Sequence, residues 1–130
     1  MPRNSIPILI AGIAALMAVT GLVVSGGPSV GKAEKRDQAR LDDLIALRDL
    51  THCIAEVSGG VLPASIDGTD LCPSAIAFTD PYTGDDYRYE WVSARGFKLC
   101  APFEYPERIS LAGAASLDPS TGCIQFTYRP

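Results

Sequence analysis

The chain has 130 residues, enough for one compact domain and little more. Its 11 Lys and Arg residues against 15 Asp and Glu residues give a formal net charge of −4. Nucleic acids attract proteins that carry clustered cations, so this acidic balance excludes nucleic-acid binding as the function.

The first element is the apolar stretch Ile6–Val24, which contains no charged side chain. As a helix it would be about 28 Å long, close to the ~30 Å thickness of the hydrocarbon core of a bilayer. A helix also satisfies its own backbone hydrogen bonds within lipid. We therefore predict a transmembrane helix over residues 6–25, with the lipid bilayer as its partner.

The orientation of that helix follows from charge and from the cysteines. The short tail over residues 1–5 carries Arg3 and no acidic residue, so we expect it to stay in the cytoplasm. All the cysteines follow the apolar stretch: Cys53, Cys72, Cys100 and Cys123. An even number of cysteines in a small domain indicates disulfides and an oxidising compartment. We expect a single-pass protein of a bacterial inner membrane whose periplasmic domain covers residues 33–130; a cleaved signal peptide and a secreted domain are the alternative.

Residues 26–32 are rich in glycine, serine and proline and predict a flexible hinge. Beyond it, apolar residues recur every three or four positions, the pattern of an amphipathic helix. They are Leu41, Leu44, Ile45, Leu47, Leu50, Ile54 and Val57. Ser58-Gly59-Gly60 then ends the helix. The first turns are almost entirely polar, so we expect Asp37 and Arg40 to be solvated surface charges.

The second half of the chain shows the period-two pattern of strands. Tyr87, Tyr89 and Trp91 alternate with polar residues, and a second alternating run follows at 97–103, which together predict a β-hairpin. A last strand is expected at 123–128.

Between these strands, residues 104–122 are expected to form a loop with a brief helical turn at 111–115. The predicted fold class is α+β: one amphipathic helix packed on a small antiparallel sheet.

The cysteine positions predict how the disulfides pair. Cys100 lies on the polar face of its strand with Lys98, and Cys123 lies on the polar face of the last strand. Cysteines on matching faces of neighbouring strands can meet at disulfide distance, which predicts Cys100–Cys123 and leaves Cys53–Cys72. The rival interpretation is a zinc site with four thiolates, but the sequence has no C-x-x-C pair.

Two sets of residues are candidates for binding. Asp80, Asp85 and Asp86 lie within seven residues and offer oxygen ligands for a weak calcium site, although the spacing is not that of an EF-hand and suits an ordinary turn. The aromatic residues form either an interaction surface or part of the core: Tyr82, Tyr87, Tyr89 and Trp91.

No arrangement of residues predicts catalysis or a cofactor. The only histidine, His52, is adjacent to Cys53, and neighbouring side chains on a helix point about 100° apart, so the two do not form a nucleophile–base pair. We expect His52 on the helix surface. The sequence predicts a protein that is not an enzyme and uses no cofactor.

Several motifs occur in a characteristic order after the apolar segment. They are Arg40-Leu41-x-x-Leu44, Gly60-x-Leu62-Pro63, Asp80-Pro81-x-Thr83-Gly84-x-x-Tyr87-x-Tyr89 and Phe97-x-Leu99-Cys100-Ala101. This order resembles type IV pilin-like proteins, especially the pseudopilins of type II secretion systems. The resemblance implies a pilin-like fold and pilin-like or other membrane proteins as partners. The chain lacks the basic-Gly cleavage site of prepilins and the glutamate that follows it, so the resemblance extends to the fold and not to filament formation.

These observations predict a membrane-anchored, non-enzymatic protein with a protein-interaction or secretion- or pilus-accessory role. The alternative is an anchored periplasmic module that binds a ligand or calcium through the loop at 80–86.

Overall fold

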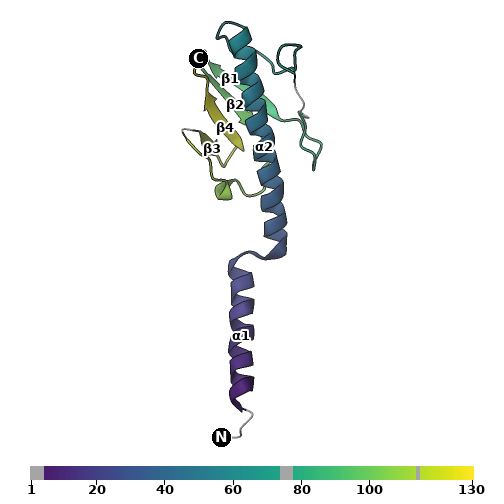
Figure 1. Cartoon of the computed structure of the whole chain (residues 1–130), viewed down its shortest axis with the longest axis vertical. Coiled ribbons are helices and arrows are strands. Elements are labelled where there is room, and N and C mark those ends of the chain that lie inside the picture. Colours follow the sequence, from purple (N-terminus) through teal and green to yellow (C-terminus); the bar gives the residue numbers. More distant parts are fainter. Residues whose placement is uncertain (1–4, 74–77, 114) are drawn as a thin grey trace. The chain divides into compact units, whose positions relative to one another are not determined.

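The computed structural model describes residues 5–73, 78–113 and 115–130 (Figure 1). The chain forms two compact units, Met1–Ala33 and Glu34–Pro130. Each unit has its own chemistry: the first is apolar, and the second holds the sheet, the charges of interest and both disulfides.

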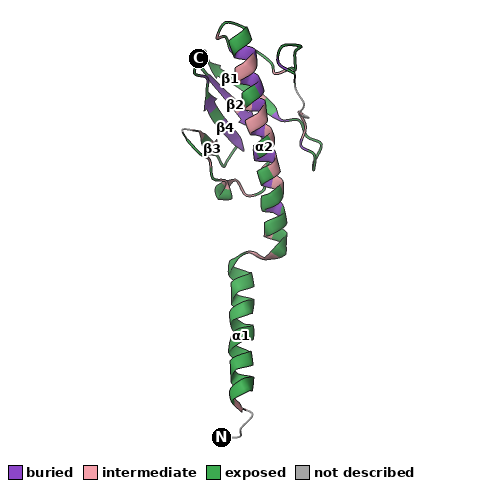
Figure 2. Cartoon of the chain, viewed as in Figure 1, coloured by how far each residue is buried: buried purple, intermediate pink, exposed green. Residues whose placement is uncertain are grey.

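The first unit contains the helix α1, Ser5–Val24. The helix exposes all of residues 6–24, which are drawn in green in Figure 2. It is the helical segment of the described chain that is long and apolar enough to cross a membrane. A soluble domain would bury such a surface against a core, and α1 buries none of it.

The expected hinge over residues 26–32 is much shorter than predicted. Only Ser25 and Gly26 form a turn, and the next helix, α2, spans Gly27–Val57. Gly26 and Gly27 have φ angles of 80° and 73°, which L-residues with a side chain rarely adopt. Pro28 does not interrupt the helix because its missing N–H falls in the first turn, where no intrahelical partner exists.

In the second unit, α2 lays its apolar face on a sheet, as the sequence predicts (Figure 2). Leu44 and Leu47 are among the most deeply buried side chains of the helix. They belong to the same core as Phe97, Leu99 and Ile124, none of which exposes any surface. Burial of each such side chain contributes roughly 1.5–3 kcal/mol.

The sheet has four antiparallel strands in the order β1-β2-β4-β3. The strands are β1 (Arg88–Ser93), β2 (Gly96–Cys100), β3 (Ser116–Asp118) and β4 (Cys123–Thr127), and a 3₁₀ turn covers Pro106–Arg108. The β1–β2 hairpin and β4 lie where the sequence predicts them. The α+β class with a helix on an antiparallel sheet is therefore confirmed.

The segment between β2 and β4 differs from its prediction. We expected a loop with a helical turn at 111–115, whereas the described residues of that range are not helical, and the 3₁₀ turn falls earlier, at Pro106–Arg108. Strand β3 was not predicted at all. It contains three residues, too few for an alternating pattern to stand out.

Candidate functional site

Two disulfides fix the second unit. Cys53 is bonded to Cys72, and Cys100 to Cys123, the same pairing that the sequence predicts. Cys100 and Cys123 are direct partners in the β2–β4 register, so the bond joins strands that are already side by side. The Cys53–Cys72 bond instead ties the last turns of α2 to the loop that follows it.

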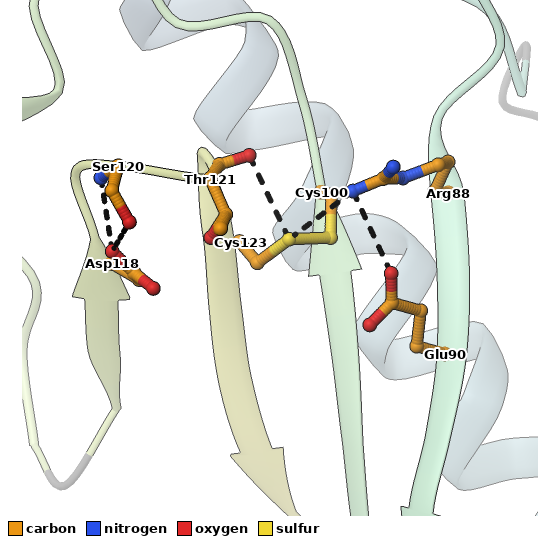
Figure 3. The surroundings of a disulfide bond; sticks show 7 residues. All are labelled: Arg88, Glu90, Cys100, Asp118, Ser120, Thr121 and Cys123. Atoms are coloured by element: carbon orange, nitrogen blue, oxygen red, sulfur yellow. Dashed lines mark hydrogen bonds and ion pairs between the residues drawn. A yellow bond between two sulfur atoms is a disulfide. The ribbon is translucent and has the colours of Figure 1, made fainter.

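Figure 3 shows the surroundings of the Cys100–Cys123 disulfide. The Arg88 guanidinium lies 3.7 Å from Cys123 Sγ and 3.5 Å from a Glu90 carboxylate oxygen. Glu90 and the two cysteines are close enough together to resemble a metal site. Both sulfurs are already committed to the disulfide, however, so neither is available as the thiolate that a metal would need.

The strongest charge cluster centres on Arg40, which contradicts its prediction as a solvated surface residue. Arg40 is 1% exposed and Asp37 is 2% exposed. The guanidinium donates from Nε to Asp80 Oδ2 at 2.6 Å and from Nη1 to Asp37 Oδ1 at 2.8 Å. Buried charges persist in proteins only when they are paired and hydrogen-bonded, and these are.

Asp37 also organises the chain after β2. Its carboxylate accepts the backbone N–H of Glu104 at 2.9 Å and that of Tyr105 at 2.7 Å. Asp37 therefore holds the 104–105 segment against α2, while Arg40 holds the Asp80 loop. The polar residues expected to stand clear of the core in fact attach two loops to the helix.

Glu104 closes the cluster at its exposed side. Both of its carboxylate oxygens accept hydrogen bonds from Arg36, at 2.6 and 2.7 Å, and Oε1 also lies 3.2 Å from Arg40 Nη1. The hydrogen bonds from Arg36, with a smaller contribution from Arg40, lower the pKa of Glu104 to about 2. Glu104 therefore carries its negative charge at neutral pH.

The loop that offered weak candidate ligands for calcium belongs to this network through Asp80. One Asp80 oxygen pairs with Arg40, and the other accepts the N–H of Tyr82 at 2.8 Å. Burial alone would raise the pKa of Asp80, but these two hydrogen bonds reverse the effect and lower it. Asp85 and Asp86 are exposed, and the described structure does not gather the three carboxylates into one metal-binding group. The loop is a turn closed by Gly84 N–H donating to Asp80 O at 2.8 Å.

The aromatic set divides into two pairs. Tyr87 is buried and donates its hydroxyl to Asp43 at 2.7 Å, while Tyr89 is half-buried and donates to the Pro63 carbonyl at 2.7 Å. Burial and, next, the hydrogen bond to Asp43 raise the pKa of Tyr87. These two are structural.

The other two aromatic residues remain open to solvent. Tyr82 is 54% exposed, and Trp91, on the edge strand β1, is 57% exposed. These two are the members of the set that are available to a partner.

His52 is not the plain surface residue that the sequence predicts. Its ring lies edge-on to Phe97 and Tyr128, with ring centres 5.9 and 5.5 Å apart. Its Nε2 atom is buried without a hydrogen-bond partner. Position 52 lies seven residues, about two helical turns, after Ile45 of the apolar stripe, and that spacing was the available signal that the ring would lie near the core.

Comparison with protein-family models, with curated proteins and with solved structures gives no match. The resemblance to pilin-like proteins therefore stays an expectation. The features on which a function can be argued are the apolar helix α1, which could span a membrane, and the disulfide-linked domain, whose cystines suit an extracytoplasmic compartment.

Proposed function

We propose that this protein is anchored in a bacterial inner membrane by α1 and presents its disulfide-linked domain in the periplasm. There it acts without catalysis, through protein contacts, in a secretion- or pilus-accessory role. The observation that carries the proposal is the uninterrupted apolar surface of α1, none of which is buried.

Lipid is the environment that suits this surface best. Soluble proteins rarely expose contiguous apolar patches larger than a few hundred Å². Residues 6–24 form one continuous exposed run that is almost entirely apolar and contains no charge. Immersion in hydrocarbon removes this surface from water, and the helical hydrogen bonds leave no backbone group unsatisfied there.

The role in protein contacts rests on the domain's exposed aromatic residues. Tyr82 and Trp91 both expose more than half of their surface. Aromatic residues are enriched at protein interfaces because they bury a large area with little loss of side-chain entropy. Val92, next to Trp91, is also exposed, at 43%, and adds apolar surface to the same edge strand.

The membrane anchor is tested by extraction of membranes at alkaline pH. The native chain should stay in the pellet. Leu16→Arg places a charge in the middle of α1, at a cost of about 2.5–3.5 kcal/mol on insertion scales, and should move protein to the soluble fraction. Leu71→Arg is the matched control, since Leu71 is 76% exposed on the domain and should leave the distribution unchanged. Recovery of the native chain from cytosol with free thiols would refute the proposal.

The contact surface is tested by a photoreactive residue placed at position 91 in intact cells. A discrete cross-linked product should form there. The same residue at position 98, on the polar outer face of the sheet, is the control and should give no product. Equal products at the two positions would show that contact is nonspecific.

A further inference from the structure

A hollow of about 430 Å³ lies beside α2 at the end of β4. Its polar lining comes from two parts of the chain: Arg48, Asp49 and His52 on α2, and Gln125, Thr127 and Arg129 on and after β4. The volume is within the range of about 300–1,000 Å³ that small-molecule sites occupy. Nothing in the proposed role as an interaction domain requires this hollow.

One of the two ring nitrogens of His52, the histidine that lines the hollow, is buried. Its Nε2 is buried without a hydrogen-bond partner, and the ring is edge-on to Phe97 and Tyr128. A buried unpaired N–H is rarer in proteins than an unpaired acceptor, so we assign the lone pair to Nε2 and the proton to Nδ1. Burial and then the nearby Arg48 lower the pKa of His52, which keeps the ring neutral at pH 7. His52 therefore retains one donor, Nδ1–H, for a group in the hollow.

The charge in the hollow is opposite in sign to that of the whole chain. The chain has a net charge of −4, yet two arginines line this hollow with a single carboxylate, Asp49. Arg48 directs both Nε and Nη2 to the same Asp49 oxygen, at 2.9 and 2.6 Å. The ion pairs among the described residues do not include Arg129. One positive charge is thus left without a counter-charge.

We propose that the hollow binds a small organic monocarboxylate, which pairs with Arg129 and accepts a hydrogen bond from His52 Nδ1. Guanidinium groups present paired N–H donors that match the two oxygens of a carboxylate. The excess of one positive charge matches a monoanion better than it matches a dianionic phosphate. Gln125 and Thr127 also line the hollow.

The test uses the fact that His52 is the only histidine in the chain, so its imidazole NMR signals are assigned without ambiguity. The full-length protein in detergent micelles is titrated with sodium lactate, with sodium phosphate, and with sodium chloride at equal ionic strength. Lactate should shift the His52 signals along a saturable curve, and chloride should not. A shift that rises linearly and equally with lactate and chloride would overturn the site, and tighter binding of phosphate would overturn the assignment to a monocarboxylate.

Two arginine variants separate a specific site from general attraction to positive charge. Arg129→Gln should weaken lactate binding about tenfold, which corresponds to the loss of roughly 1.4 kcal/mol of a charge-assisted contact. Arg95→Gln removes an exposed arginine outside the lining and should leave the affinity unchanged. Unchanged backbone amide spectra would show that both variants remain folded. Equal affinity in the native protein and Arg129→Gln, or equal weakening in the two variants, would refute the proposal.

Discussion

At the scale of single residues, Arg40 has the largest predicted effect on stability. Replacement by methionine keeps much of the volume but leaves the carboxylates of Asp37 and Asp80 buried without their cation. Removal of one partner from a buried ion pair typically costs 3–5 kcal/mol. We therefore expect Arg40→Met to lower the free energy of unfolding by about that amount in urea titrations, followed through the single tryptophan, Trp91.

Arg108→Met is the control for this experiment. Arg108 pairs with Glu34 at 2.6 Å, but both side chains are 44% exposed. Exposed pairs contribute little to stability because solvent screens them, so Arg108→Met should change the free energy of unfolding far less than Arg40→Met does. Similar losses in the two variants would show that burial does not set the strength of the Arg40 network.

Glu104 makes the stability of the domain sensitive to acid. Its pKa in the folded state is lowered to about 2, chiefly by the hydrogen bonds from Arg36, against an ordinary value of 4.5. A group with a lowered pKa contributes its stabilisation above the unfolded-state pKa and loses it as the pH falls toward the folded-state pKa. The free energy of unfolding should therefore fall between about pH 4.5 and pH 2, and Asp80, whose pKa is also lowered, adds to the fall.

Urea titrations across this pH range measure the effect. Glu104→Gln cannot ionise, so its stability should be lower at neutral pH and should change less steeply on acidification. If the free energy of unfolding of Glu104→Gln falls with pH as steeply as that of the native protein, Glu104 does not contribute to the acid response.

The sequence could not reveal the Arg40 network, and the reason is physical. Asp37 and Arg40 lie in a polar stretch of helix, and a local pattern of charges is the same whether the helix face meets solvent or two folded loops. Their partners, Asp80 and Glu104, are 40 or more residues away from Arg40. The cysteine pairing could be predicted from the sequence because strand alternation fixes the face on which Cys100 and Cys123 lie. Once these two are paired, only Cys53 and Cys72 remain.

At the scale of elements, the turn that leads into β4 depends on Gly122. Its φ is 69°, and a Cβ there would lie 2.4 Å from the Ala101 carbonyl oxygen. Gly122→Ala therefore combines backbone strain of about 1–3 kcal/mol with a clash against main chain that cannot rotate away. Gly113→Ala is a matched control, because its φ is 85° but a Cβ there has nothing within 4 Å.

Thermal unfolding of the two variants separates these costs. Gly113→Ala should show the strain alone, and Gly122→Ala should lower the melting temperature clearly further. If the two variants melt together, the close approach of residues 101 and 122 is not maintained in solution.

The elements that the sequence identified are those whose pattern repeats several times. The apolar stripe of α2 extends over more than four turns, and the β1–β2 hairpin shows two alternating runs. Strand β3 has only Ser116, Leu117 and Asp118, and it forms because β4 already offers a free edge. The sequence predicted too late a start for α2 because glycine and proline usually end helices. Here Gly27 and Pro28 are the first two residues of the helix.

At the scale of the whole molecule, the chain consists of an apolar unit and an acidic one. Size limits the second unit, since a domain of roughly 100 residues buries a modest share of its surface and gains from covalent links. The ~20-residue loops closed by the disulfides each contribute on the order of 3 kcal/mol in the chain-entropy model. Stability of the domain therefore rests jointly on the core, the buried charges and the two cystines.

Helix α2 is fastened to the rest of its domain by two different kinds of chemistry. Around residues 37–40 the attachment is electrostatic, and at Cys53 it is covalent. Acid therefore weakens the first attachment and leaves the second intact, while a thiol reductant does the reverse. Either treatment alone should expose one half of α2 to amide exchange while the other half stays protected. The two ends of the helix should therefore unfold locally and independently, one in acid and the other under reducing conditions.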